Sequence, residues 1–174
     1  MDNMKLTLSY RNENDKAFGL AGMILSLGSL DALDTIVRVS LDSAGPMVTF
    51  NNQYYYAMSP KLSPKVAWEN LKRNFYITSA MVMGNVMARS MVRDNAAVPD
   101  AVLDDILAEM QNEGCDSVQL ENDEVKQLYD HILMRMRRLF GNPRMHPVVR
   151  ELSGVLELRR SLTADEVIEE INRL

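Results

Sequence analysis

The sequence is poor in the side chains that form disulfides or bind transition metals. It contains one cysteine, Cys115, and two histidines, His131 and His146, among 174 residues. A single cysteine excludes an intramolecular disulfide, and these three separated residues do not supply the ligand set of the usual zinc sites. We therefore expect no bound metal and no cofactor. Because disulfides are missing, we also expect a reducing compartment, with the cytoplasm as the location.

The sequence also lacks a recognisable catalytic signature or phosphate-binding loop. Ser26 lies in a segment without the first glycine of a nucleophile elbow. Cys115 has acidic neighbours, which disfavour a reactive thiolate. Asp105, Glu109 and Glu113 recur every four residues and share one helix face, which we interpret as solvated because such charges repel one another. No catalytic residue is predicted, and an enzyme is the less favoured interpretation.

Long apolar runs and an excess of positive charge are both missing. Residues 17–30 are too short for a membrane span and contain three glycines, and residues 75–92 contain Asn85 and Arg89. The N-terminus lacks the basic start and early apolar run of a signal peptide. The net charge of −5 disfavours indiscriminate binding to phosphate backbones. We expect no membrane association, and nucleic acid is a possible but not favoured partner.

The first 60 residues have the pattern of a small sheet with one helix. Residues 4–10 and 35–41 alternate as half-buried strands do, and residues 47–50 and 53–58 resemble further strands around a turn at 42–46. Residues 16–27 are predicted as a helix capped by Asn14 or Asp15. Gly19 and Gly22 weaken this helix, or they let another backbone approach closely.

Prolines and capping residues divide the remainder of the chain into helices. Ser63 followed by Pro64 is typical of a helix start, and the next proline is Pro99, so one long helix is predicted over about 64–93. Three more helices are predicted over 99–114, 122–140 and 147–160.

The last predicted helix has the clearest local signal. Thr163 and Glu166 fit a capping box, and Leu162 and Val167 are placed for a hydrophobic staple. An apolar stripe then predicts which side chains dock this helix: Val167, Ile168, Ile171 and Leu174.

Together these patterns predict an α+β fold that is mainly α. A small N-terminal β-α-β-β element is followed by about five helices, one of them long. We expect one domain over residues 1–174, with a possible subdivision into residues 1–60 and 61–174.

Charge is distributed unevenly along the helical part. Residues 94–124 contain ten acidic and no basic side chains, whereas residues 126–160 contain eight basic and three acidic ones. We favour internal or intersubunit pairing between the two segments, because the whole chain is acidic. The alternative is a basic face for an acidic partner or nucleic acid, made of Arg135, Arg137, Arg138, Arg144, Arg150, Arg159 and Arg160.

The second half of the long helix is apolar around most of its circumference. One small sheet and one neighbouring helix would cover such a surface poorly, so a second copy of the chain is a natural partner. We therefore expect a homo-oligomer, most simply a dimer. The predicted interface contains Phe75, Ala80, Met83, Gly84, Met87, Ala88 and Met91. The alternative is a core helix wrapped by the chain's own helices.

Three functional hypotheses follow, in order of preference. The first is a non-enzymatic interaction or assembly protein that acts through helical surfaces as a homo-oligomer. The second is a nucleic-acid-associated accessory protein that uses the basic region from Arg135 to Arg160. The third is a small-molecule binder or enzyme with a pocket between sheet and helices. A large buried apolar interface, a contiguous basic face and an enclosed cavity would distinguish them.

Overall fold

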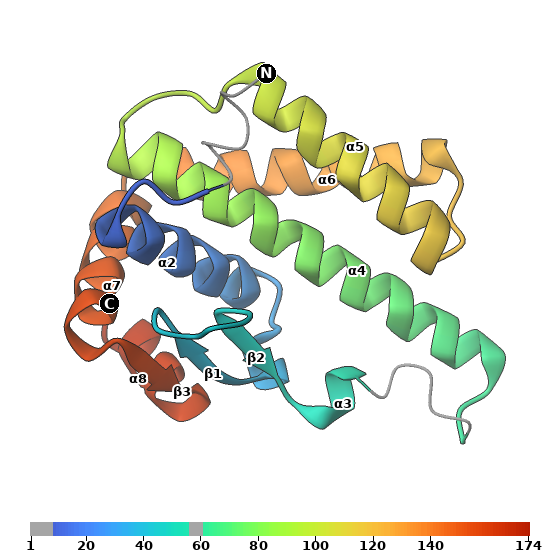
Figure 1. Ribbon diagram of the computed structural model, residues 1–174, viewed down its shortest axis with the longest axis horizontal. Coiled ribbons are helices and arrows are strands. Elements are labelled where there is room, and N and C mark those ends of the chain that lie inside the picture. Colours follow the sequence, from blue (N-terminus) through green and yellow to red (C-terminus); the bar gives the residue numbers. More distant parts are fainter. Residues whose placement is uncertain (1–8, 56–60) are drawn as a thin grey trace.

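The computed structural model describes residues 9–55 and 61–174 and confirms an α+β fold that is mainly α (Figure 1). The elements follow the chain in this order: α2 (Glu13–Ser29), a 3₁₀ turn η1 (Leu33–Thr35), β1 (Ile36–Ser40), β2 (Val48–Phe50), α3 (Asn52–Tyr55), α4 (Pro64–Met87), a π-helical segment η3 (Ala88–Arg93), α5 (Asp100–Ser117), α6 (Asn122–Phe140), α7 (Met145–Arg159), β3 (Ser161–Thr163) and α8 (Ala164–Arg173).

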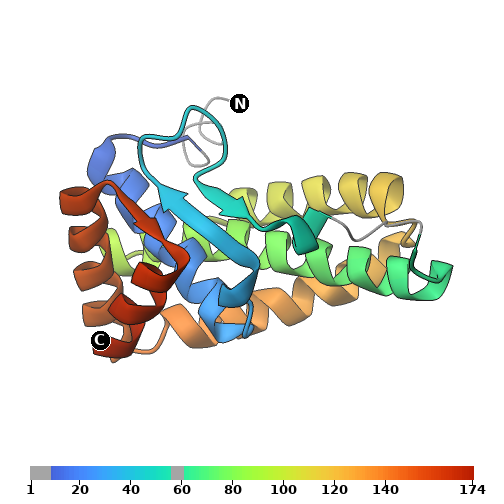
Figure 2. The ribbon, with the colours of Figure 1, turned by 90° about the horizontal axis from the view of Figure 1, so that it is seen from below.

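The sheet of the described residues has three short antiparallel strands in the order β2-β1-β3. Val39 of β1 pairs with Val48 of β2 on one side and with Leu162 of β3 on the other. The sheet packs at one end of the helical part, next to α8 (Figure 2). Because β3 comes from the C-terminal part of the chain, the sheet joins segments more than 100 residues apart in sequence.

The prediction for the N-terminal β element is partly wrong. The strands predicted over 35–41 and 47–50 are present as β1 and β2, but Asn52–Tyr55 form the short helix α3 instead of a strand. Asn51 explains the difference, because its side-chain oxygen accepts a hydrogen bond from the backbone N–H of Tyr54 at 3.1 Å and starts a helical turn. The strand predicted over 4–10 falls largely on residues outside the described range, and so do residues 56–58 of the strand predicted over 53–58.

Helices α2 and α4 form the centre of the fold. The side chain of Asn12 caps α2 by accepting a hydrogen bond from the backbone N–H of Asp15, so the cap lies two residues before the predicted Asn14. Helix α2 packs along α4 and against α7 (Figure 1). Buried hydrophobic side chains from the sheet and from the helices belong to one cluster, which includes Val39, Phe140 and Leu162.

The predicted long helix is present with a change of helix type near its end. Ser63 caps α4, with Pro64 at the first helical position, as expected. From Ala88 to Arg93 the chain continues as π-helix. A π-helix has about one more residue per turn than an α-helix, so the side chains of this segment point in other directions than a continued α-helix would give them. Such segments occur frequently at functional sites.

The capping box predicted at the last helix is confirmed. The backbone N–H of Thr163 donates to Glu166 Oε2 at 2.8 Å, and the backbone N–H of Glu166 donates to Thr163 Oγ1 at 3.4 Å. Val167 is fully buried, but Ile168 is 38% exposed, so Ile168 does not dock α8 as predicted. Among the helices of the described residues, none combines the length and apolar character needed to cross a membrane.

Candidate functional site

Two arginines of the predicted basic face, Arg159 and Arg160, are ion-paired within the fold. Arg160 Nη2 lies 2.8 Å from Glu13 Oε2 of α2 and also pairs with Asp42 after β1. Arg159 Nη1 lies 3.5 Å from Glu170 Oε1 of α8. These contacts attach the C-terminal end of α7 to three other segments of the chain.

Two further arginines of this set bind backbone carbonyls. Arg150 Nη2 donates to the carbonyl of Val92 at 3.0 Å, and Arg135 donates to the carbonyl of Ser29 at the end of α2. Three exposed side chains make no hydrogen bond or ion pair to any other described residue: Arg137, Arg138 and Arg144. Arg135 and Arg150 are thus exposed but partly engaged within the chain, whereas the three other arginines lie around the α6–α7 connection.

The favoured pairing between the acidic and basic segments is not found within the described part of the chain. No ion pair there joins an acidic residue of 94–124 to a basic residue of 126–160. Asp94 instead pairs with Arg11 and Arg93, 3.0 Å from Arg93 Nη1.

The side chains predicted at the dimer interface lie inside the single chain. Met91 is partly buried. The other six are buried: Phe75, Ala80, Met83, Gly84, Met87 and Ala88. Helix α4 packs against α2, α5 and α6, so the chain's own helices cover the surface that appeared to need a second copy. The structure thus matches the alternative of a wrapped core helix, and these residues no longer give a reason for an interface.

The close helix approach expected from the glycines occurs between α2 and α4. A Cβ added at Gly22 would lie 2.2 Å from the carbonyl oxygen of Gly84, and one added at Gly84 would lie 1.8 Å from Ser26 Oγ. Both distances are far below van der Waals contact, so no larger residue fits without a shift of the helices. The second of the two interpretations of Gly22, a close backbone approach, is the one the structure supports.

A buried ion pair, which the sequence analysis missed, joins the start of α2 to η3. Asp15 is fully buried and Arg89 is 3% exposed. Arg89 Nε lies 2.9 Å from Asp15 Oδ1, and Arg89 Nη2 lies 2.7 Å from Asp15 Oδ2. The signal available in the sequence was a single arginine inside an otherwise apolar helical stretch, where a charge requires a partner.

The groups around this ion pair make it a structural network. Arg93 Nη1 lies 3.4 Å from Asp15, and the side-chain amide of Asn85 donates to Tyr10 Oη at 2.8 Å. Burial acts to raise the pKa of Asp15, but hydrogen bonds from Arg89 and Arg11 outweigh it and hold the pKa well below its ordinary value. A carboxylate held ionised by arginines is a poor acid or base near neutral pH.

The histidines and the cysteine have ordinary surroundings. His146 Nε2 lies 2.9 Å from the carbonyl oxygen of Phe140, and the ring of His131 lies edge-on to Tyr76 at 5.9 Å. Cys115 Sγ lies 3.4 Å from the side-chain oxygen of Asn122. Among the residues that the structure describes, no three histidine, cysteine or acidic side chains lie together as a metal site would require.

A shallow depression lies on the outer side of α8. Its lining residues all belong to that one helix: Asp165, Ile168, Glu169, Asn172 and Arg173. Since neither the sheet nor another helix contributes to it, it is not the pocket that the small-molecule hypothesis requires.

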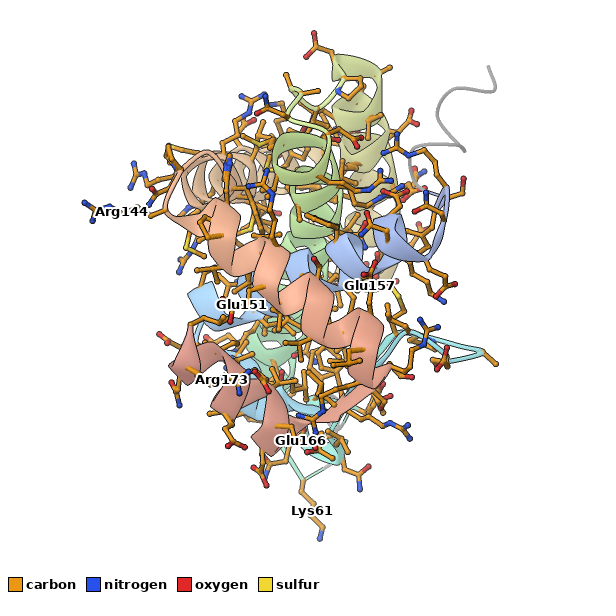
Figure 3. The ribbon with its side chains drawn as sticks, turned by 90° about the vertical axis from the view of Figure 1, so that its left-hand side faces the viewer. Lys61, Arg144, Glu151, Glu157, Glu166 and Arg173 are labelled. Carbon is orange, nitrogen blue, oxygen red and sulfur yellow. The ribbon has the colours of Figure 1, made fainter. Side chains whose placement is uncertain are left out.

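Helix α7 has one face that no other described element covers, and we call it the α7 outer face. It contains Pro147, Glu151, Gly154 and Leu158, at helical spacings of four, three and four residues. Leu158 is 84% exposed, more than any other exposed large hydrophobic side chain in the described residues. Helix α7 crosses this end of the molecule, with Glu151 and Glu157 on opposite sides of the helix (Figure 3).

Comparison with known proteins gives no relative for this chain: no protein family, no curated protein and no solved structure matches it.

Proposed function

We propose that this protein is a non-enzymatic interaction or assembly protein that acts through a helical surface as a homo-oligomer. The observation that supports it is the α7 outer face. There a leucine with 84% of its surface exposed and an open glycine lie on a helix whose other side is anchored in the core by Val149, Leu152 and Leu156. A firmly held helix with an uncovered apolar position is suited to helix–helix association.

The rest of the described surface supports this function less well. Met134 of α6 is 59% exposed, but its neighbours on that face are the charged or polar side chains of Asp130, His131 and Arg138. The side chains of the interface predicted along the long helix lie in the core, the exposed apolar side chains of α4 (Val66, Trp68 and Val82) are each no more than 41% exposed, and the Asp15–Arg89 network has partners within the fold. Helix α7 therefore replaces α4 as the candidate surface for self-association.

Nucleic-acid binding is a second candidate, because Arg137, Arg138 and Arg144 are exposed around one connection. Three arginines on a chain of net charge −5 would give only weak, salt-sensitive binding. Retention of the protein on single- or double-stranded DNA or RNA at low salt, lost on replacing the three arginines with glutamine, would support this candidate.

Light scattering coupled to size exclusion tests the proposed function. We expect a mass near twice the 19.7 kDa of one chain when the protein is loaded at high micromolar concentration, and a fall toward one chain on dilution. A mass of 19.7 kDa at every concentration would overturn homo-oligomeric assembly.

A further inference from the structure

We infer that α7 is the self-association element and that it pairs antiparallel with α7 of a second copy, across a two-fold axis next to Gly154. This inference rests on the proposed function and specifies the surface that performs it. A two-fold axis requires a self-complementary surface, and the α7 outer face meets that requirement in its shape and in its charges.

Nothing in the described part of the chain requires a glycine at position 154. A Cβ added at Gly154 would meet nothing within 4 Å, and its backbone does not have a positive φ. A glycine in the interior of a helix lowers helix stability relative to alanine. Close approach of a second helix would use the missing side chain, as the approach of α4 uses Gly22 on α2.

The spacing of the outer residues fits an antiparallel helix pair. Positions 147, 151, 154 and 158 form the alternating four- and three-residue stripe along which helices pack knobs into holes. With the axis near Gly154, Leu158 of one copy would lie opposite the hole that the partner forms from Pro147, Arg150, Glu151 and Gly154. By symmetry, the Leu158 side chains of both copies would then be covered.

The charges beside this stripe select the antiparallel direction. Arg150 and Glu157 lie seven residues apart, which places them on the same side of α7 and about 10 Å apart along it. In an antiparallel pair centred between them, Arg150 lies opposite the partner's Glu157, and the same contact recurs by symmetry. In a parallel pair this flank would face the partner's opposite flank, so Arg150 would not meet the partner's Glu157.

Both charged side chains are already held in position. Arg150 donates to the carbonyl of Val92 at 3.0 Å, and Glu157 accepts a hydrogen bond from the side-chain amide of Asn14 at 2.8 Å. Each retains further donor or acceptor capacity, because a guanidinium has five N–H groups and a carboxylate two oxygens. Restricting their conformations before association reduces the entropy lost on pairing.

Helix α6 provides an internal comparison. Asp130 and Arg137 have the same seven-residue spacing beside the exposed Met134, but the opposite flank carries His131 and Arg138. In an antiparallel pair His131 would face the partner's Arg138, so that flank offers no ion pair. On α7 the corresponding flank brings Glu151 opposite Leu158, with no like-charge contact.

Charge reversal across the proposed axis gives the main experiment. Arg150→Glu and Glu157→Arg should each weaken self-association by roughly a hundredfold, because each places like charges opposite each other twice. An equimolar mixture of the two variants should restore the dimer mass, since every cross-pair is then of opposite charge. Circular dichroism melts show whether each variant folds. Leu158→Glu replaces a side chain that is 84% exposed and should also give monomers without loss of the fold.

A cysteine at the proposed two-fold axis tests the pairing by forming a new bond instead of weakening the dimer. In a Cys115→Ser background, Gly154→Cys should form a disulfide between copies under mild oxidation, whereas Met134→Cys, on the exposed side of α6, is the matched control. Suppose that the unmodified protein is dimeric, that the charge variants and Leu158→Glu stay dimeric, and that Gly154→Cys forms no more disulfide than the control. The α7 inference then fails, while self-association stands. If the unmodified protein is monomeric, both fail.

Discussion

Two regions of this molecule differ in the surroundings of their glycines. The inner region is the contact of α2 with α4 and η3, and the outer region is made of α7, β3 and α8. At the α2–α4 crossing, a Cβ on Gly22 would lie 2.2 Å from backbone of the neighbouring helix, whereas a Cβ on Gly154 of α7 would meet nothing within 4 Å. The inner glycine allows two helices of one chain to touch. The outer glycine has no such neighbour among the described residues.

The same contrast applies to charge. Asp15 and Arg89 are almost entirely buried and hold each other, whereas Arg160 pairs with Glu13 and Asp42 at a surface where all three side chains are more than a third exposed. Water screens the outer ion pairs but is excluded from the inner one. Matched substitutions in the two regions should therefore have very different effects.

The largest effect is expected from Arg89→Met. It leaves Asp15 buried without its main partner, and breaking a buried ion pair in this way costs about 3–5 kcal/mol of unfolding free energy. The same substitution at the surface, Arg160→Met, should change the melting temperature little. Chemical denaturation of both variants measures the difference.

A second substitution separates charge from packing at this site. The double variant Asp15→Leu/Arg89→Met should recover part of the stability that Arg89→Met loses. The reason is that no unpaired carboxylate remains when both partners are replaced. Equal melting temperatures for Arg89→Met and Arg160→Met would remove the distinction between the two regions.

The next largest effect concerns the glycines. Gly22→Ala should destabilise the protein by about 1–3 kcal/mol, because the new methyl group meets the Gly84 carbonyl and the helices must separate. Gly154→Ala should instead stabilise the isolated chain by up to about 1 kcal/mol, since alanine is the better helix former and space is available. Thermal unfolding at a concentration where the protein is monomeric compares them. Destabilisation by both variants would contradict the contrast.

Local signals in the sequence predicted most helices well. Ser63 with Pro64, and Thr163 with Glu166, define helix starts through hydrogen bonds to residues three positions away, so the information is contained in a short segment. The strand predicted at 53–58 was wrong where Asn51 starts a helical turn, a competing local hydrogen bond. The three-residue strand β3 was missed because its partner, β1, lies more than 100 residues away in sequence.

Pairing over long distances explains the remaining differences. Which helix fills the space around Gly84, and which acid pairs with Arg89, depends on tertiary packing that spacing along the chain does not specify. The apolar circumference of α4 correctly indicated burial but not whether the covering helices belong to the same chain. Exposure of Leu158 likewise emerges only once the inner face of α7 is occupied.

The free energy of unfolding should decrease at acidic pH, because the buried carboxylate of Asp15 becomes protonated. The pKa of Asp15 in the folded protein lies below its ordinary value of 3.8, so its ionised form stabilises the fold above about pH 4, and this contribution is lost as the pH decreases further. Asp15→Asn cannot ionise and lacks the contribution at every pH. We expect the stability difference between the unmodified protein and Asp15→Asn to shrink between pH 7 and pH 3 in urea unfolding. A constant difference over this range would show that the charge of Asp15 is not what stabilises the contact.

The smallest effect tests whether the outer region, made of α7, β3 and α8, unfolds together with the inner one. Thr163 caps α8, and the residues that anchor it on either side, Leu162 and Val167, are fully buried. Thr163→Ala removes the oxygen that accepts from the Glu166 N–H and should cost about 1 kcal/mol if α8 belongs to the cooperative unit. Thr163→Ser retains that oxygen and serves as the control. A lowered denaturation midpoint for alanine but not for serine indicates that the outer helices share the stability of the core. If the midpoint is unchanged in both variants, α8 unfolds before the core does, and the surface beside α7 is held less firmly than the buried contacts of β3 and α8 indicate.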